Sequence, residues 1–560
     1  MVNKNEVYEI TIEDIGTEGQ GIGHVDGEAV FVKDTLPGDT ASIKIIKAKK
    51  NLAYGRLMEI IKPSGYRTTP LCDVARSCGG CTLQHMDYDA QLKYKWDKVK
   101  NLLQRIGGIS EPEKLMESAE DKKAYGLVEP FHYRNKMQFP VGYDKEGKAV
   151  LGFYAGRTHS IIPLSDCVIG HPVNKFIIKA VKEFIDRYKI SIYDEEKHKG
   201  LIRHVLTRVG FHTNELMVCM VINGNDIPHY EKLHEMISSE VAKFGGEILF
   251  KSFMININKD KTNRILGFDS KVLIGDPFIS DYIGDVKFNI SPQSFFQVNP
   301  EMTEKLYSKA LEYAALSGGE KVWDMYCGIG TISLFLAEKA GNVYGVEIVP
   351  QAIDDAKNNA KLNDIKNVEF HVGKAEEVVP GLYEKDRERY TADVVVVDPP
   401  RKGCDEKLLE TLVSMAPARL VYVSCDPATL ARDIKYLTDH NFELKKVAVF
   451  DQFSHGIHVE TVCLLSQRKP DTTIEVDLDI SELEVSSAET KATYEEIKSY
   501  VLKKYGLKVS NLYIAQVKRE CGIVERINYN LPKTEGNRVP QCPEDKRKAI
   551  KDAFIHFQMI

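Results

Sequence analysis

Short stretches in which apolar and polar residues alternate, separated by glycine turns, occupy the first sixty positions of the chain. They read Y-E-I-T-I from Tyr8, E-A-V-F-V from Glu28, A-S-I-K-I-I-K from Ala41 and G-R-L-M-E-I-I from Gly55. A period of two predicts half-buried β-strands, and several short strands joined by Gly, Asp and Pro turns are typical of a small closed barrel. We therefore predict a β-barrel domain over residues 1–62.

The pattern changes twice further along the chain. Between residues 63 and 290, runs such as L-I-R-H-V-L-T-R-V-G from Leu201 and E-L-M-V-C-M-V-I-N-G from Glu215 predict antiparallel strands in an α+β domain. Over residues 291–468, strands alternate with helices, as in K-V-W-D-M-Y followed, after a glycine turn, by I-S-L-F-L-A-E-K-A. This alternation predicts a Rossmann-like α/β domain with a doubly wound parallel sheet.

The end of the chain differs again. Residues 469–490 are acidic and rich in small residues, which is typical of a flexible linker. Residues 491–560 contain three amphipathic helical patterns, of which the first ends at Gly506 and the second is capped by Ser510. They predict a small helical module, for which nucleic-acid binding, packing and recruitment of a partner are all open.

Composition indicates a multidomain globular chain. Its 560 residues, 43% hydrophobic and 28% charged, are too many for one core. No apolar run approaches the roughly 18 residues of a membrane span, and the first residues lack the pattern of a signal peptide. Eleven cysteines, an odd number in so long a chain, are not typical of a disulfide framework. We expect a monomeric cytoplasmic protein without a membrane partner.

The net charge of −6 excludes a protein coated in basic surface, so binding to nucleic acid would depend on local patches. Basic side chains bind phosphates and aromatic faces stack on unpaired bases. One candidate set lies late in the barrel and consists of Lys44, Lys47, Lys49, Lys50 and Arg56. A second lies in the central domain and consists of Tyr133, Arg134, Asn135, Lys136 and Arg157. For each set, an ordinary solvated face is the alternative.

Three cysteines share an irregular loop after the barrel. Cys72, Cys78 and Cys81 have Asp, Arg, Ser and Gly as neighbours, which is not the setting of core cysteines. The spacing is typical of a metal or cluster site, and Cys167 in P-L-S-D-C-V-I is the best candidate for a fourth ligand. Four thiolates suit either zinc or an iron–sulfur cluster, and the spacing does not separate the two.

A glycine turn follows the first strand of the α/β domain. The segment D-M-Y-C-G-I-G-T places Gly328 in this turn, and the next strand, N-V-Y-G-V-E, ends in Glu347. Glycines let a ligand approach the backbone, and a carboxylate at the next strand end accepts hydrogen bonds from ribose hydroxyls. The turn lacks the third glycine of a pyrophosphate-binding motif. This favours S-adenosylmethionine over NAD or FAD.

Two further strands of this domain end in reactive groups. A-D-V-V-V-V-D ends in Asp398 before Pro-Pro-Arg, and V-Y-V-S-C ends in Cys425 before Asp-Pro. Because the carboxyl ends of parallel strands meet at one edge, we expect both residues to share a site with Gly328 and Glu347. The helix that starts after Cys425 would favour its thiolate and so a nucleophile. An ordinary buried cysteine is the alternative.

Several longer motifs resemble those of one enzyme family. They are S-F-F-Q-V-N, D-x-Y-C-G-x-G-T, D-P-P-R-K-G, V-Y-V-S-C-D-P-A-T-L-A-R-D and H-V-E. The set is similar to the RNA (uracil-5-)-methyltransferases, and most to the branch that modifies 23S ribosomal RNA and carries an iron–sulfur cluster. The first domain resembles a TRAM domain, an OB-like RNA-binding module, through its G-T-E-G-Q-G-I-G-H and L-P-G-D turns. The resemblance runs from about Tyr8 to Arg468.

The resemblance implies a class I S-adenosylmethionine-dependent methyltransferase fold and a role for each motif residue. It implies that the cofactor and the target base are lined by Gln297, Tyr326, Gly328, Glu347 and Asp398. Cys425 would be the nucleophile and Glu460 the general base. A [4Fe-4S] cluster, in preference to zinc, would be held by Cys72, Cys78, Cys81 and Cys167.

The expected reaction is methylation of C5 of a uridine in 23S rRNA. Uracil C5 is a poor nucleophile, and a thiolate that adds to C6 makes C5 electron-rich. Glu460 would then remove the C5 proton. The T-loop uridine of tRNA is the alternative substrate. A non-catalytic RNA-binding protein is the alternative of another class.

Overall fold

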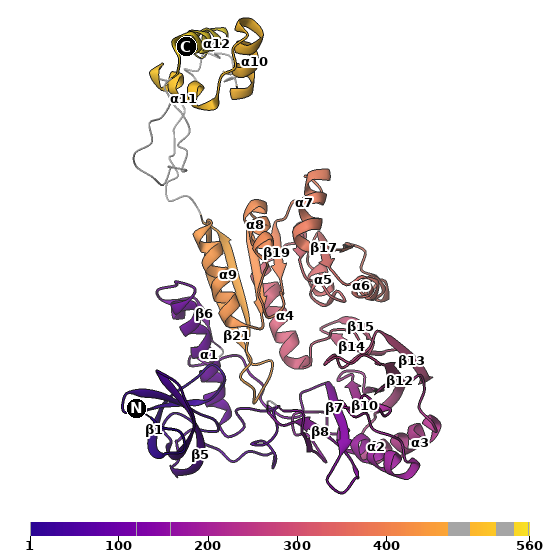
Figure 1. Cartoon of the computed structure of the whole chain (residues 1–560). Helices are drawn as coiled ribbons and strands as arrows, with labels where there is room; N and C mark the ends of the chain where they lie inside the picture. Colours follow the sequence, from indigo (N-terminus) through magenta and orange to yellow (C-terminus); the bar gives the residue numbers. More distant parts are fainter. Residues whose placement is uncertain are drawn as a thin grey trace. The chain divides into compact units, whose positions relative to one another are not determined.

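The computed structural model describes residues 2–118, 120–156, 158–468, 493–521, 542–557 and 559 (Figure 1). The chain divides into two compact units, Met1–Lys469 and Pro470–Ile560. The predicted linker, 469–490, and Arg157 of the second candidate RNA-facing set lie outside the described residues. None of the helices in the described ranges is long and apolar enough to cross a membrane.

The first domain is a closed five-stranded barrel with strand order β1-β2-β3-β5-β4. Its inward positions are buried apolar residues, among them Ile12, Val30 and Ile43. Gly23 allows β2 to pass close to β1, because a Cβ there would lie 2.5 Å from the carbonyl oxygen of Thr11. The predicted closed barrel is confirmed, with strands β1 Val7–Ile15, β2 Gly21–Val25, β3 Glu28–Val32, β4 Thr40–Ala48 and β5 Leu52–Lys62.

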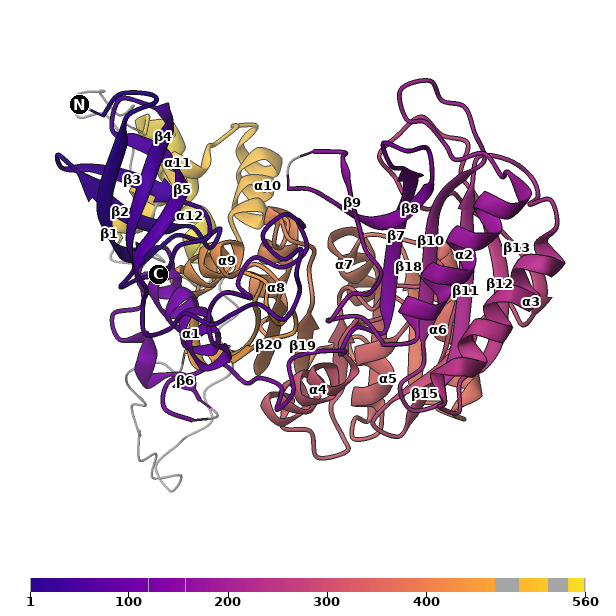
Figure 2. The same ribbon diagram turned by 90° about the horizontal axis from the view of Figure 1, so that it is seen from below.

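The central domain is built on a seven-stranded sheet of order β13-β12-β11-β10-β7-β8-β9. Helices α2 (Asn174–Tyr188) and α3 (Tyr230–Val241) pack on each other and against this sheet (Figure 2). The pairing is antiparallel as predicted except between β11 and β12, which are parallel because α3 lies between them in the chain. The strands are β7 Lys136–Tyr143, β8 Ala149–Tyr154, β9 Ile161–Pro163, β10 Ile202–Val209, β11 Glu215–Ile222, β12 Leu249–Ile257 and β13 Asp269–Gly275.

Residues between the barrel and the central sheet pack on the α/β domain. Helix α1 spans Tyr88–Arg105, and the Asp87 side chain caps its start by accepting a hydrogen bond from the Ala90 N–H. After a short 3-10 turn, Pro112–Lys114, strand β6 (Met116–Glu117) pairs with β21 at the edge of the α/β sheet. The region predicted as one central domain, 63–290, therefore contributes to two sheets.

The α/β domain holds an eight-stranded sheet of order β18-β17-β16-β19-β20-β22-β21-β6. The strands from β16 to β20 are parallel, and the strand order reverses between β16 and β19. Alternate residues of β19 face two different cores, so both faces of the sheet are covered. The remaining strands of this sheet are β16 Lys321–Asp324, β17 Asn342–Glu347, β18 Val368–Val372, β19 Val394–Val397, β20 Arg419–Ser424, β21 Phe442–Phe450 and β22 Glu460–Gln467.

Along the chain, helices alternate with the parallel strands of this sheet, as in a doubly wound fold. They are α4 Pro300–Ala314, α5 Thr331–Ala337, α6 Pro350–Leu362, α7 Ala375–Lys385, α8 Glu406–Met415 and α9 Pro427–Asp439. A hairpin of β14 (Ile279–Ile283) and β15 (Val286–Ile290) precedes them. Ligands of such folds bind outside the carboxyl ends of the strands, where the strand order reverses.

In the part of the second unit that the structure describes lie three helices, α10 (Tyr494–Tyr505), α11 (Asn511–Glu520) and α12 (Glu544–His556), in line with the three predicted helical patterns. Thr493 and Glu496 form a reciprocal capping box at the start of α10, and Gly506 ends it in the left-handed conformation. Ser510 caps α11, since its side chain accepts a hydrogen bond from the Tyr513 N–H. The apolar faces of the three helices share one core.

Candidate active site

One cavity of about 760 Å³ opens at the carboxyl edge of the parallel strands. All seven residues predicted for the cofactor and the chemistry line it, namely Gln297, Tyr326, Gly328, Glu347, Asp398, Cys425 and Glu460. The carboxyl ends of parallel strands meet at one edge of a sheet, and this predicts a shared site for four of the residues that end or follow such strands. They are Gly328, Glu347, Asp398 and Cys425. Their roles are a separate question that their geometry helps to answer.

The glycine turn after β16 is held by a buried carboxylate. Asp324 accepts hydrogen bonds from Ser333 Oγ, at 2.6 Å, and from the Tyr326 N–H, at 3.3 Å, which ties the turn to α5. Burial raises the pKa of Asp324 to about 6. Gly328 and Gly330 both have positive φ, a conformation that favours glycine, so the turn keeps its backbone close to the cavity. Glu347 lines the cavity from the end of β17.

Gln297 lies on the segment that leads into α4. Its carbonyl oxygen accepts a hydrogen bond from Asn135 Nδ2, at 2.9 Å, and the Val298 carbonyl accepts one from the Asn135 N–H. Asn135 is 5% exposed, and so is Tyr133, whose hydroxyl donates to the carbonyl of Ser454. Both were predicted to face RNA. That prediction is wrong for these two residues, because they are buried and fix neighbouring backbone instead.

Glu460 reaches the site by a different route from the other residues. It begins β22, which runs antiparallel to β20 with Thr461 opposite Ser424. The start of β22 therefore lies at the carboxyl end of β20, beside Cys425. Glu460 begins an antiparallel strand, so the expectation that functional residues lie at the carboxyl ends of parallel strands does not predict it.

Cys425 follows β20, and the next residue, Asp426, caps α9. The Asp426 side chain accepts hydrogen bonds from the N–H groups of Ala428, at 2.9 Å, and Thr429, at 3.2 Å. These donors are then not free to stabilise a thiolate. Burial, followed by the nearby Glu460 and Asp398, raises the pKa of Cys425 to about 12. Burial therefore outweighs any stabilisation of the thiolate by the helix start, contrary to the prediction from the sequence.

The two carboxyl groups of the site are suited to hold protons. Burial, with a further contribution from Asp324, raises the pKa of Asp398 to about 7. Glu460 is 3% exposed, and its burial and the nearby Asp398 raise its pKa well above the usual range. The nearby Arg401 guanidinium opposes this shift. Asp398, with a pKa near neutral pH, can both accept and release a proton.

The cavity wall also contains four residues to which the sequence assigned no role, namely Arg401, His458, Phe295 and Phe453. Arg401 follows Pro400 in the D-P-P-R motif, and its Nη2 lies 3.5 Å from Nε2 of His458. Burial, with nearby cations, lowers the pKa of His458 to about 4, so its ring is neutral. Phe295, 67% exposed, and Phe453 also line the cavity. Arg401 and Phe295 stand in the motifs D-P-P-R-K-G and S-F-F-Q-V-N, whereas Phe453 lies in none of the motifs.

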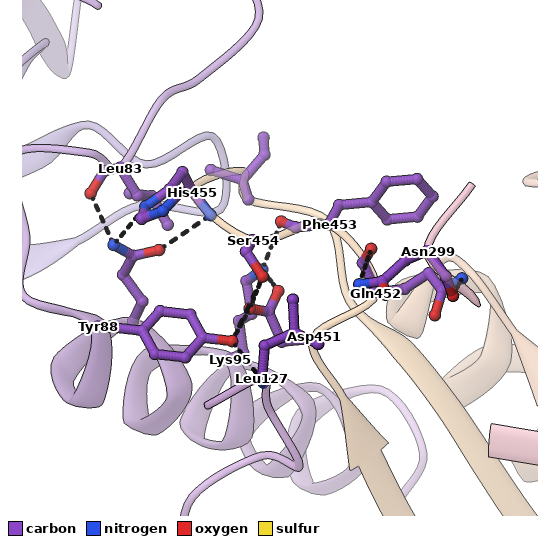
Figure 3. A network of polar contacts seen from close by, with 12 residues as sticks. Leu83, Tyr88, Lys95, Leu127, Asn299, Asp451, Gln452, Phe453, Ser454 and His455 are labelled. Carbon is purple, nitrogen blue, oxygen red and sulfur yellow. Dashed lines mark hydrogen bonds and ion pairs between the residues drawn. The ribbon is translucent and has the colours of Figure 1, made fainter. Parts of the chain in front are cut away.

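The segment that carries Phe453 and His458, residues 451–459, is held by α1 (Figure 3). Lys95 and Asp451 form an ion pair whose side chains are both fully buried. Lys95 Nζ also donates to the Phe453 carbonyl, at 3.0 Å. The Asp451 carboxylate accepts further hydrogen bonds from Tyr88 Oη, at 2.7 Å, and Ser454 Oγ, at 2.8 Å.

The same segment is tied to the barrel. Lys98 Nζ donates to the carbonyl oxygens of Thr17, at 3.2 Å, and Ile457, at 3.0 Å. On the other side, Asn299, which caps the start of α4, donates a hydrogen bond from Nδ2 to the Gln452 carbonyl. The wall of the cavity is thus braced from the barrel, α1 and α4 together.

The four predicted cluster cysteines, Cys72, Cys78, Cys81 and Cys167, line a second cavity of about 230 Å³. Arg134 and Lys136 line it too and would balance negative charge. In the described ranges, no three His, Cys, Asp or Glu side chains are placed to hold a single metal ion. Four thiols around a shared space fit an iron–sulfur cluster, which is larger than one ion.

Comparison with known proteins decides the family. A model of the tRNA (uracil-5-)-methyltransferase family matches residues 170–468, and a model of the TRAM domain matches residues 2–58. The chain belongs to the tRNA (uracil-5-)-methyltransferase family. The predicted methyltransferase and TRAM barrel are confirmed, and the residues after 468 lie outside both family models.

Relatives within the family match most of the chain. Proteins named as uncharacterized RNA methyltransferases from Halalkalibacterium halodurans and Clostridium tetani are 49% and 48% identical to it. Each match covers 83% of this chain, and 98% and 97% of the respective relative. The crystal structure of Pyrococcus abyssi tRNA (uracil-54, C5)-methyltransferase in complex with S-adenosyl-L-homocysteine has 28% sequence identity and a TM-score of 0.64. It covers 82% of this chain and 99% of that one.

Proposed function

We propose that this RNA (uracil-5-)-methyltransferase transfers a methyl group from S-adenosylmethionine to C5 of a uridine through a covalent adduct between Cys425 and C6. The observation that carries the proposal is the shared cavity. It places a thiol, two carboxyl groups and a glycine turn after a parallel strand around one space.

The proposed reaction begins when the Cys425 thiol loses its proton. Because the pKa of this thiol is raised to about 12 by burial and the two nearby carboxyl groups, the proton must pass to a base in the cavity. The sulfur then forms a bond to C6, and the electron pair of the C5–C6 double bond is displaced toward the uracil O4. C5 attacks the methyl carbon of the sulfonium, and S-adenosylhomocysteine leaves.

The adduct is resolved by a proton transfer. Glu460 takes the proton from C5, the C5–C6 double bond re-forms and the bond from C6 to Cys425 breaks. Glu460 suits this step because it lies beside Cys425 at the start of β22, and its raised pKa makes its carboxylate a stronger base. Asp398 lies close enough to raise the pKa of both groups and so is suited to hold the ring or exchange protons with them.

S-adenosylmethionine supplies the methyl group. We assign its ribose to Glu347 at the end of β17, and its methionine end to the turn at Gly328 and to Gln297. The Pyrococcus abyssi relative, solved with S-adenosyl-L-homocysteine, supports a cofactor of this class. The TRAM barrel supports an RNA substrate, and its exposed Lys47, Lys49, Lys50 and Arg56 are candidate phosphate contacts.

We propose further that Cys72, Cys78, Cys81 and Cys167 hold a [4Fe-4S] cluster. Their common cavity supports a site with four thiolates, and the family resemblance favours the cluster over zinc. When bound, the cluster would link the cysteine loop to Cys167 of the central domain. It would also be capable of electron transfer, which methyl transfer does not require. The chain already links this loop to β8, because the Gly79 N–H donates to the Tyr154 carbonyl.

The proposed substrate is 23S rRNA, on the strength of the TRAM barrel together with the four-cysteine set. The T-loop uridine of tRNA is the second candidate, since the Pyrococcus abyssi relative is named for position 54 of tRNA. An unpaired or loop uridine is expected in either case, because extrusion of a base costs least there.

Mapping of 5-methyluridine tests the choice of substrate. The RNA of a deletion strain is compared with that of the parent and of a strain complemented with the Cys425→Ala variant. Loss of one 23S rRNA modification in both mutants supports the proposal. Loss of the T-loop modification alone replaces rRNA with tRNA, and unchanged 5-methyluridine in both RNAs refutes the proposed function.

A further inference from the structure

The helical module after residue 490 has a charge balance opposite to that of the whole chain. Between residues 491 and 560 there are 14 Lys and Arg against eight Asp and Glu, whereas the chain as a whole has a net charge of −6. The family models end before this module, so membership of the family assigns it no role.

The packing of α10 on α12 brings several of these basic residues together. Tyr500 stacks on His556 with ring centroids 4.3 Å apart, and Lys504 Nζ lies 2.7 Å from Asp552. These two contacts show that the helices are antiparallel. The end of α10 therefore comes beside the turn of α12 that carries Lys548, and Lys508 follows α10 by three residues.

On α12, Lys548 and Lys551 share a face, because they are three residues apart. The buried residues of α12, such as Ile550 and Phe554, face the core of the module instead. Together with Lys504 and Tyr505 at the end of α10 and Lys508 after it, they form a set that we name the basic patch, which consists of Lys504, Tyr505, Lys508, Lys548 and Lys551.

The charge of this patch is largely uncompensated. In the described part of the module, Lys508, Lys548 and Lys551 have no ion-pair or hydrogen-bond partner. Asp552 is already bound by Lys504, and Glu544 by Arg547. The other acidic residues of α10 and α12 lie in first turns, where the helix dipole favours them.

An exposed aromatic ring lies among the lysines. Tyr505 is 43% exposed, and Lys504 Nζ lies 5.5 Å from the centre of its ring. Unpaired lysines around an exposed tyrosine are the combination that binds phosphates and stacks on unpaired bases.

We propose that the basic patch binds the sugar-phosphate backbone of the RNA that the enzyme modifies, with a base stacked on Tyr505. The module would then add a second RNA contact to that of the barrel. Such a contact strengthens RNA binding without entering the chemistry. This inference goes beyond the proposed reaction and does not depend on which uridine is methylated.

The test uses the full-length protein and compares two double variants with equal loss of charge. Lys508→Gln/Lys548→Gln removes two patch lysines. Lys498→Gln/Lys546→Gln is the matched control, since Lys498 pairs with Glu495 and Lys546 lies over the Tyr513 ring. Kd is measured by filter binding to unmodified transcripts of 23S rRNA and of a tRNA over a range of salt concentrations, without S-adenosylmethionine.

The patch variant is expected to bind its preferred transcript about three- to ten-fold more weakly than the control variant. The slope of log K against log salt should fall by about 1.4–1.8, the value for two lost phosphate contacts. Tyr505→Ala, added to the patch variant, should weaken binding of the transcript by at least about a further five-fold. Equal Kd values and equal slopes for the two double variants would overturn the proposal. Because binding is measured without methyl transfer, this failure is distinct from failure of the proposed reaction.

Discussion

The buried pair of Lys95 and Asp451 offers a quantitative test of how the active-site wall is held. Lys95→Met keeps the bulk of the side chain and removes its charge. Asp451 then stays buried with hydrogen bonds from Tyr88 and Ser454 but without a countercharge, and the Phe453 carbonyl loses its donor. Breaking one side of a buried pair costs about 3–5 kcal/mol, and a lost hydrogen bond about 1 kcal/mol.

We therefore expect the free energy of unfolding of the first unit to fall by about 3–5 kcal/mol in Lys95→Met. Urea unfolding is followed by the fluorescence of Trp96, the neighbour of Lys95, in a Trp323→Phe background that removes the other tryptophan. Lys93→Met is the control on the same helix. Its partner, Asp97, forms an exposed pair with it, so the change should stay within about 0.5 kcal/mol.

A double-mutant cycle separates the pair from its surroundings. Lys95→Met/Asp451→Asn should recover part of the loss, with a coupling energy of about 1–3 kcal/mol. The single variant should also lower kcat at least about ten-fold at unchanged affinity for S-adenosylmethionine, since Phe453 and His458 lie on the released segment. Stability equal to that of the Lys93→Met control, or strictly additive losses in the double variant, would refute the reasoning.

Three other changes have definite expected outcomes. Cys425→Ala should abolish methyl transfer while binding of S-adenosylmethionine, measured by calorimetry, stays intact; residual transfer would exclude the adduct. Burial raises the pKa of Asp398 to about 7 from an unfolded value near 3.9, so its share of the stability is present below pH 4 and is lost as pH rises through 7. At pH 8.5 the free energy of unfolding of Asp398→Asn should therefore exceed that of the parent by up to about 4 kcal/mol, whereas at pH 4 the two should not differ in this way. An equal effect of the substitution on Tm at pH 4 and pH 8.5 would contradict the raised pKa of Asp398. Anaerobically purified Cys78→Ser protein should lose its visible absorption and its iron, whereas Cys219→Ser, a buried cysteine elsewhere, should keep both; zinc in the parent would overturn the cluster.

The strand ends of the α/β domain could be predicted because a local pattern determines them. Asp398 and Cys425 each close a short apolar run, and a parallel sheet collects such ends at one edge. The barrel was predictable for the same reason, since its strands alternate and its turns contain glycine. Glu460 needed the family motif, because it begins an antiparallel strand.

What could not be predicted depends on contacts between distant residues. Lys95 and Asp451 are 356 positions apart, and neither lies in a motif. Tyr133 and Asn135 look like surface residues in a basic, aromatic run, and only the packing of that run against the segment at Gln297 shows that they are buried. The thiol of Cys425 looked activated by the helix that follows it. The Asp426 side chain takes the donors of that helix, a competition that sequence alone does not reveal.

The central claim is tested most directly by the covalent adduct itself. Glu460→Gln is incubated with substrate RNA and S-adenosylmethionine, denatured, digested with nuclease and protease, and analysed by mass spectrometry. We predict a methylated uridine nucleotide attached to the peptide that contains Cys425, and no such adduct with Cys425→Ala/Glu460→Gln. A nucleotide attached to another cysteine, or methylated RNA released without any adduct, would contradict the account.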